Sequence, residues 1–324
     1  MFGALNLQDV DLFDAQQALG FLRQQAAAIE AEVYETPYAD VQYPELVPVD
    51  TGLDEWAKSV TYYSTDKVGK AEWFHHKAQD VPYADVNRSE GEVAIEMAAI
   101  GYEYTIEEIA QARRLGISLD TEKASAALRA YEEFVDDVAL YGSTDKGWAG
   151  LLNNATVTAG TAPADGDSGS TTFPSKTSNQ VIRDVNALIG GIYVDTRRIE
   201  VADTLLMSLE RYNYLATTPR SDNSDETILS WLLRTNVLTV TTGRRLRIYA
   251  VLGLETAGVG GTQRMIAYRY DKSVVKMHLP MPHRFLPAAN VPGSIIFKVP
   301  GIFRLGGTEI RRKAAVRYPC LLYT

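Results

Sequence analysis

The sequence has few residues of the kinds that build disulfides and metal sites. Its 324 residues include one cysteine, Cys320, and four histidines. A single thiol cannot form an intrachain disulfide, and it excludes a zinc site made of several cysteines. His75 and His76 are adjacent on an expected strand, so they point to opposite faces and cannot chelate one metal ion. His278 and His283 lie in a proline-rich irregular segment that lacks a nearby carboxylate. We therefore expect no metal site.

Long apolar runs and a recognisable leader are also missing. No run approaches the roughly 18 to 20 apolar residues needed to cross a bilayer. The N-terminal segment has no basic region followed by an apolar one, so it does not predict a signal peptide. With 46% apolar and 23% charged residues, the composition is that of a folded protein. We expect a soluble, cytoplasmic, globular chain with one large or two smaller domains.

No motif predicts catalysis or a cofactor. The sequence contains no Gly-x-x-x-x-Gly-Lys-Ser/Thr loop, and the glycines at 258–261 do not open an evident helix, so nucleotide binding is unsupported. Residues Gly166-Asp167-Ser168-Gly169 match the tetrapeptide around the serine of trypsin-like proteases. They lie in a low-complexity loop, and no histidine precedes Ser168 in a plausible triad context. We expect no cofactor and no enzymatic activity, and a soluble α/β hydrolase using Ser168 is the alternative.

Charge is distributed unevenly along the chain. The 32 basic and 41 acidic residues give a net charge of −9, which argues against a general nucleic-acid-binding protein. Residues 1–60 contain 11 acids and 2 bases, whereas residues 264–324 contain 11 bases and 2 acids. These ends can attract each other within a chain or between copies, although two solvated faces would give the same counts. The candidate charge-paired residues are Asp9, Asp11, Asp14, Arg311, Arg312 and Lys313.

The first part of the chain predicts an arm followed by a long aromatic hairpin. A helical pattern covers residues 12–33, and an extended segment with three prolines follows at 34–52. Residues 58–64 and 70–76 alternate and flank a turn-like segment at 65–69, and an alternating strand follows at 92–106 with Val93, Ile95 and Met97 on one side. A two-stranded ribbon is marginal in water, so it must fold back or lie on another molecule. Its candidate contact residues are Tyr62, Tyr63, Lys67, Lys70, Trp73 and Phe74.

The rest of the chain mixes helices and strands. Thr105 and Glu108 form a capping box for a short helix, and Asp120 or Thr121 caps a long helix that runs to Gly142. The apolar face of this long helix is expected at Ala124, Leu128, Tyr131, Val135 and Val138. Further expected elements are a mobile loop at 158–172, helices at 178–189 and 225–233, a strand and helix within 199–213, and strands at 245–255, 263–271, 294–299 and 308–318. In the last strand, Ile310, Ala314, Val316 and Tyr318 would oppose a wet basic face of Glu309, Arg311, Lys313 and Arg317.

The order of these elements resembles a known family. The long helix ends in Tyr141-Gly142, and Gly147-Trp-Ala-Gly-Leu-Leu-Asn-Asn154 comes next. This arrangement resembles major capsid proteins of tailed bacteriophages, whose Hong Kong 97-type fold is shared with encapsulins. The likeness in sequence is concentrated in residues 43–157. Many capsid sequences place a proline soon after the motif, whereas Ala155 and Thr156 follow here.

The resemblance implies an α+β fold with four kinds of region. These are an N-terminal arm, an extended β-hairpin loop, a peripheral domain with a long spine helix, and a mixed α/β axial domain. Carried over to this sequence, the arm is 1–42, the peripheral domain 43–57 and 89–156 with its spine helix at 120–142, the extended loop 58–88, the axial domain 157–264, and the return strands of both domains 265–324.

The resemblance also implies a structural role without catalysis. The chain would self-assemble as pentamers and hexamers into an icosahedral head shell in the host cytoplasm, and it would reside in the virion. Implied partners are packaged double-stranded DNA, bound weakly and without specificity, a portal, and decoration proteins. Only some forty residues precede the body, which implies a separate scaffolding protein or none. Some relatives crosslink a loop lysine to a neighbour, and Lys67, Lys70 and Lys77 are available. An encapsulin-type compartment and a tail or decoration protein remain alternatives.

Overall fold

The computed structural model describes residues 40–70, 73, 83–105, 107–108, 119–290 and 296–321. The chain divides into two units, Met1–Asp40 and Val41–Thr324. All the elements given below belong to the second unit. The helix predicted within residues 12–33 lies outside the described residues.

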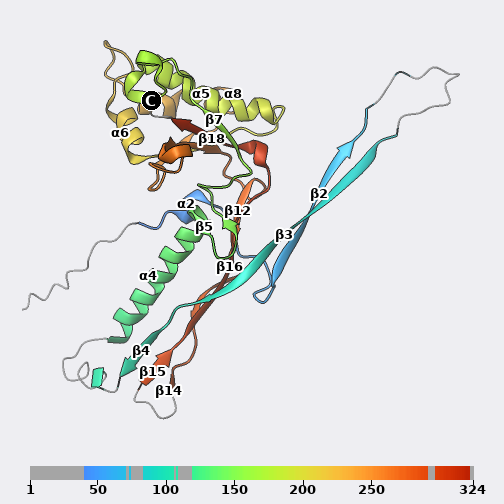
Figure 1. The fold of residues 1–324 in the computed structure, drawn as a ribbon, viewed down its shortest axis with the longest axis vertical. Coiled ribbons are helices and arrows are strands. Elements are labelled where there is room, and N and C mark those ends of the chain that lie inside the picture. Colours follow the sequence, from blue (N-terminus) through green and yellow to red (C-terminus); the bar gives the residue numbers. More distant parts are fainter. Residues whose placement is uncertain are drawn as a thin grey trace, which may run out of the picture. The chain divides into compact units, whose positions relative to one another are not determined.

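The predicted hairpin is present, with longer strands than expected. Strands β2 (Ser59–Val68) and β3 (Asp85–Ala99) run antiparallel as a two-stranded ribbon (Figure 1). The predicted turn at 65–69 is wrong, because residues 65–68 continue β2 and pair with the start of β3. Most of the predicted second limb, 70–76, lies outside the described residues.

The base of the hairpin continues into a four-stranded sheet. Past the last pair with β2, β3 pairs with β16 (Gly301–Gly306), which pairs with β13 (Met281–Phe285), giving the order β13-β16-β3-β2. Within β3, Ile95 is buried and Val93 is half-buried, as predicted, but Met97 is exposed. The single strand predicted at 92–106 is in fact two, since β4 (Tyr102–Thr105) follows β3 and joins another sheet.

The long helix predicted at 120–142 is confirmed as α4 (Leu119–Leu140). Tyr131, Val135 and Val138 are buried as predicted, together with Ala127. Leu128 is a wrong core assignment, because 42% of its surface is exposed. The capping box that precedes α4 is also confirmed: the Thr105 amide donates to the Glu108 carboxylate at 3.0 Å, and the Glu108 amide donates to Thr105 Oγ1 at 3.2 Å.

A second sheet of six strands is built from the later part of the chain. Its order is β10-β18-β11-β8-β9, and β7 pairs with the other edge of β18. The strands are β7 (Thr158–Thr161), β8 (Thr204–Met207), β9 (Arg247–Ala250), β10 (Gln263–Arg264), β11 (Ile266–Tyr268) and β18 (Val316–Leu321). The helices between them are α5 (Ser178–Asp195), α6 (Leu209–Thr217), α7 (Ile228–Arg234) and α8 (Val237–Thr242). The strand-then-helix predicted within 199–213 is confirmed as β8 and α6.

Smaller elements complete the described chain. The three-stranded sheets have the orders β1-β12-β17 and β14-β15-β4, and β5 pairs with β6. Their remaining strands are β1 (Val49–Asp50), β5 (Gly142–Ser143), β6 (Trp148–Ala149), β12 (Val275–His278), β14 (Ala289–Asn290), β15 (Ile296–Val299) and β17 (Thr308–Ile310). Short helical turns are α2 (Tyr43–Leu46), η1 (Asp167–Gly169), η2 (Phe173–Ser175), η3 (Val259–Gly261) and η4 (Lys313–Ala315).

Four further expectations are corrected by the structure. The segment 158–172 begins with a strand, β7, instead of being an unstructured loop. Helix α5 extends six residues beyond the predicted end, to Asp195. The proline-rich segment around His278 and His283 forms β12 and β13. The single strand predicted at 308–318 is broken by η4, so that Ala314 is exposed and Ala315 is buried instead.

One continuous hydrophobic core connects the sheets and helices. It includes Val135 of α4, Leu206 of β8, Tyr268 of β11 and Phe303 of β16, all of which are at most 2% exposed. Tyr268 also donates a hydrogen bond from its hydroxyl to the Leu46 carbonyl at 2.6 Å. The six-stranded sheet and α4 therefore share one core.

Candidate functional site

The distal part of the β2–β3 hairpin is exposed on both faces. Ten residue pairs hold it, from Ser59 opposite Ala94 to Val68 opposite Asp85. From residue 63 to 68 and from 85 to 90, every side chain that the structure describes is exposed. β2 is also the edge strand of its sheet, so one row of its backbone groups is not used by any described strand. Such a ribbon gains little stability from its own chain.

The predicted contact residues lie along this ribbon or just beyond it. Tyr63 is 70% exposed and Trp73 is fully exposed, while Lys67 and Lys70 are also exposed. Tyr83 (87% exposed) and Val86 (48%) join them on the returning limb. Phe74 lies outside the described residues. The exposed aromatic side chains are the kind that anchors protein interfaces.

Tyr62 differs from the other predicted contact residues because it anchors the hairpin base to its own chain. Its ring is half-buried and lies under the guanidinium of Arg311, 4.8 Å from the ring centre. Burial, and then the charge and hydrogen bond of Glu309, raise the pKa of the Tyr62 hydroxyl. The ring crosses Gly91 on β3, where a Cβ would overlap it. Glycine at 91 therefore makes room for this anchor.

Behind Tyr62 lies a buried chain of charged groups. Glu309 contacts His278 Nε2 at 3.1 Å and Arg311 Nε at 3.1 Å. His278 Nδ1 is 4.0 Å from Asp50, and Lys276 donates to Asp50 at 2.8 Å. Burial alone would raise the pKa of Glu309, but its contacts with His278 and Arg311 outweigh burial and lower it. The hydrogen bond from Lys276 lowers the pKa of Asp50. The expectation that His278 has no nearby carboxylate was wrong, because Glu309 and Asp50 are distant in sequence.

The motif after α4 closes the end of that helix. The amides of Leu151 and Leu152 donate to the carbonyls of Ala139 and Leu140, at 3.0 and 2.9 Å. Asn153 then bridges the turn, since its side chain donates to the Tyr141 carbonyl at 2.6 Å and accepts from the Gly150 amide at 2.7 Å. The last carbonyls of a helix have no hydrogen-bond partner within the helix. These bonds therefore satisfy carbonyl groups that would otherwise be left without a hydrogen bond. The motif is thus explained by helix termination.

The predicted charge-paired residues are only partly described. Asp9, Asp11 and Asp14 lie outside the described residues. Arg311 is paired with Glu309 and Arg312 with Glu200, both within the same chain, while Lys313 is exposed. Pairing between the acidic arm and these bases stays a prediction.

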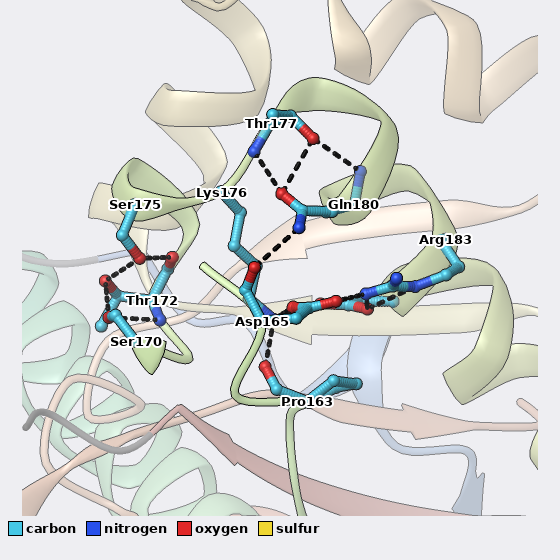
Figure 2. Close-up of polar contacts among 10 residues, drawn as sticks. Pro163, Asp165, Ser170, Thr172, Ser175, Lys176, Thr177, Gln180 and Arg183 are labelled. Atoms are coloured by element: carbon cyan, nitrogen blue, oxygen red, sulfur yellow. Dashed lines mark hydrogen bonds and ion pairs between the residues drawn. The ribbon is translucent and has the colours of Figure 1, made fainter. Parts of the chain in front are cut away.

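The low-complexity segment is tied to α5 by a charged cluster (Figure 2). Lys176 is fully buried and contacts Asp184 at 2.5 Å, Asp165 at 3.1 Å and the Pro163 carbonyl at 2.6 Å. Arg183 contacts both carboxylates from the exposed side. Thr177 and Gln180 complete a capping box at the start of α5. These contacts explain why residues 162–176 are held against the helix.

Neither histidine that the structure describes is available to activate Ser168. The residue is exposed in η1, with the left-handed backbone angle φ of 58°. His278 is engaged with Glu309, and His283 Nε2 lies 3.0 Å from the Ile100 carbonyl, so neither described histidine serves Ser168. Within the described ranges, no group of three or more His, Cys, Asp or Glu side chains could hold a metal ion. No described helix has the length and apolar character to span a membrane.

Reasoning from sequence missed the residues that anchor the hairpin. Gly91 belongs to β3, whereas Asp50 and Glu309 belong to β1 and β17 of a different sheet. The contacts of Asp50 with Lys276 and of Tyr62 with Arg311 join positions more than 200 residues apart. The one local signal was Glu309 itself, a lone acid in a basic segment.

Comparison with known proteins identifies the family. The major capsid protein family matches residues 69–319. No curated protein has a sequence significantly similar to this chain. The solved capsid of Myoviridae phage XM1 is similar with a TM-score of 0.73 and 18% identity, covering 91% of this chain and 96% of that one. A structure from Mycobacterium phage Bobi is similar with a TM-score of 0.56 and 14% identity, covering 93% of this chain and 99% of that one. The capsid of an empty GTA particle is similar with a TM-score of 0.60 and 10% identity, covering 91% of this chain and 94% of that one.

The similarity to these structures concerns the fold, because the identities are low. The family match is independent of it and covers most of the chain, including the hairpin's return strand and the motif that closes α4. Both agree with the mixed helix-and-strand architecture predicted from the order of elements. The chain therefore belongs to the major capsid protein family, the structural proteins of phage head shells.

Proposed function

We propose that this chain self-assembles into an icosahedral phage head shell in which the β2–β3 hairpin lies over a neighbouring subunit. The observation that carries the proposal is the exposed ribbon formed by residues 63–68 and 85–90, with the exposed side chains described just beyond it. Its aromatic side chains Tyr63, Trp73 and Tyr83 are between 70% and fully exposed. Covering such side chains with a second copy buries apolar surface that the chain itself leaves in water. The family membership supports the identity of that second copy.

The described sheets support a division into functional domains. The peripheral domain consists of residues 43–57 and 89–156, with α4 as its spine, and the extended loop is 58–88. The axial domain, 157–264, forms most of the six-stranded sheet. Two return strands, β11 and β18, complete that sheet, while β12, β13, β16 and β17 return to the peripheral side.

The remaining partners follow from the shell. A net charge of −9 suits weak, non-specific contact with the packaged DNA. A portal and, where used, scaffolding and decoration proteins would contact the same shell, which assembles in the host cytoplasm. A structural role needs no cofactor or catalytic residue.

The proposal is tested by shortening the hairpin without disturbing its anchor. Ser64 and Ser89 face each other across the ribbon, so residues 65–88 can be replaced by Asn-Gly, a favoured hairpin turn. Tyr62 and Gly91 remain in place. We expect the shortened chain to keep its circular dichroism spectrum and thermal unfolding temperature but to form no shells, as measured by sedimentation and negative-stain electron microscopy.

A matched control separates length from surface chemistry. Replacing Tyr63, Trp73 and Tyr83 together by serine keeps the ribbon length and removes its exposed aromatic surface, and it should also weaken assembly. Serine at Trp56, an exposed aromatic residue outside the ribbon, should not. Normal shells from the shortened chain would refute the proposed role of the hairpin. Shells that protect DNA from nuclease distinguish a head from a compartment loaded with an enzyme.

A further inference from the structure

The two ends of helix α5 carry unpaired charges of opposite sign. The helix has 18 residues, from Ser178 to Asp195, so its ends are about 27 Å apart at 1.5 Å per residue. Its C-terminal end is fixed beside the start of β18 by the ion pair between Asp195 and Arg317. Its N-terminal end is fixed beside the loop at 219–226, because Ser178 Oγ donates to the Pro219 carbonyl at 2.9 Å.

The C-terminal end, which we name the basic end, has more bases than its acids can pair. The acids there are all engaged: Asp195 with Arg317, Glu200 with Arg269 and Arg312, and Asp203 with Arg247. Four exposed arginines remain without an ion pair among the described residues. They are Arg197 and Arg198, which follow α5, and Arg244 and Arg245, which precede β9.

These arginines lie at one end of the six-stranded sheet. Thr204 at the start of β8 faces Arg247 at the start of β9, so the segments that lead into both strands are neighbours. Glu200, between Arg198 and β8, is held there by Arg269 just after β11. Arg197 and Arg198 have left-handed φ angles of 53° and 67°, a costly conformation for residues with side chains. The surrounding contacts keep both arginines in this exposed turn.

Exposed aliphatic side chains accompany the basic end. Val194, Ile199 and Val240 are 73%, 70% and 75% exposed. Arginine beside exposed apolar surface is typical of protein interfaces, where arginine is enriched. A surface that binds nucleic acid would instead have polar side chains around its basic residues. The composition of the basic end therefore favours a protein partner.

The N-terminal end of α5, which we name the acidic end, has the complementary surface. Asp222 and Asp225 are exposed in the loop at 219–226 and have no ion pair among the described residues, and exposed Asp167 lies in the loop tied to the first turns of α5. Arg220 of the same loop is also exposed, with its guanidinium over the Trp231 ring, so these three carboxylates outnumber its one positive charge. The chain thus presents both halves of an electrostatic contact, on opposite ends of one unit.

We infer that the acidic end of one copy contacts the basic end of the next copy, head to tail around a ring. Unlike charges at opposite ends cannot meet within one rigid unit, but they meet when copies repeat in the same sense. A contact of this heterologous kind closes into a ring when its rotation permits. The inference rests on the proposed shell function, because it names the contact within each capsomer.

A charge swap tests the contact. One variant carries Arg197→Glu and Arg198→Glu, a second carries Asp222→Arg and Asp225→Arg, and a third carries all four changes. Each of the first two places like charges together, so its capsomer and shell yield should fall at least about tenfold. The third restores opposite signs with the polarity reversed, so its yield should return to within about threefold of the natural chain. Yield is measured by sedimentation velocity at low and high salt.

Matched controls and a second readout keep the outcomes distinct. Arg129→Glu and Lys146→Glu reverse two bases elsewhere, each paired with a carboxylate of its own chain, and should leave yield unchanged. Thermal unfolding shows whether each variant folds, since charges of these signs also stabilise a helix through its dipole. Equal yields for all variants would overturn the head-to-tail contact. So would a variant with all four substitutions that folds but does not recover the yield. Normal yield with lost binding of a short DNA duplex would also overturn it and assign the basic end to DNA. A natural chain that stays monomeric would instead contradict the proposed shell.

Discussion

Gly150 shows how a single residue can fix the junction between α4 and the rest of the chain. A Cβ on Gly150 would overlap the Leu140 carbonyl, which is backbone and cannot move aside without opening the end of α4. We expect Gly150→Ala to lower the free energy of unfolding by about 1 to 3 kcal/mol, the usual cost of overpacking. Denaturant unfolding of the natural and variant chains measures this loss.

Gly160→Ala is the matched control for this prediction. Gly160 lies in β7, and open space surrounds the position of its Cβ. Its effect should stay within about 0.5 kcal/mol. Equal effects at both positions would contradict a specific role for the close approach at Gly150.

Residues of this motif could be singled out from sequence, but their physical role could not. Tyr141-Gly142 and the run ending in Asn154 stood out because they follow a helix with a strong 3.6-residue period. The bonds from Leu151, Leu152 and Asn153 to the helix end depend on the chain folding back on itself. No periodicity encodes such a return, so the structure was needed to explain the motif.

At the scale of elements, the hairpin base is joined to the body through Glu309. The stability of the chain should therefore decrease at acidic pH. The pKa of Glu309 is lowered from its ordinary value of 4.5 when the chain folds. A lowered pKa contributes stability above the unfolded value, and this contribution is lost as pH falls through the folded value. We therefore expect Glu309→Gln to destabilise the chain at pH 7, by about 3 kcal/mol because it removes one partner of a buried pair. The difference should shrink below about pH 4.5.

Urea unfolding at pH 7, 5 and 4 measures this dependence. Glu90→Gln, in the exposed distal ribbon, provides the control and should change stability little at any of these pH values. A stability difference for Glu309→Gln that is the same at pH 4 as at pH 7 would show that its charge is not what holds the hairpin base.

Elements with local signals were predicted, and elements defined by distant contacts were not. The period of α4 and the capping box at Thr105 were predicted because both depend on residues three or four apart. The strand predicted at 308–318 was wrong because buried and exposed residues do not alternate along this segment. Glu309 is buried against His278, and η4 then shifts the buried position from Ala314 to Ala315.

For the whole molecule, the order of elements carried more information than any single motif. The order of arm, hairpin, long helix and mixed domain predicted the family. Sheet composition could not be predicted, because β7 and β18 pair in parallel across about half of the chain. The charge asymmetry between the chain's ends was visible in sequence. Its partial neutralisation was not, since Arg312 pairs with Glu200 and Lys276 with Asp50 across the fold.

Assembly should change the environment of one tryptophan more than any other part of the ribbon. Trp73 is fully exposed in the isolated chain, whereas Trp56 is 57% exposed and lies near Arg284 and Arg304 of its own chain. If the hairpin lies over a neighbour, Trp73 leaves water when shells form, and its fluorescence should shift to the blue and resist acrylamide quenching. Comparing unassembled and assembled protein in Trp73→Phe and Trp56→Phe variants assigns the change. The shift should disappear in Trp73→Phe and persist in Trp56→Phe. Tryptophan that stays equally quenchable after assembly would mean that the ribbon projects into solvent, and that the shell is held by other contacts.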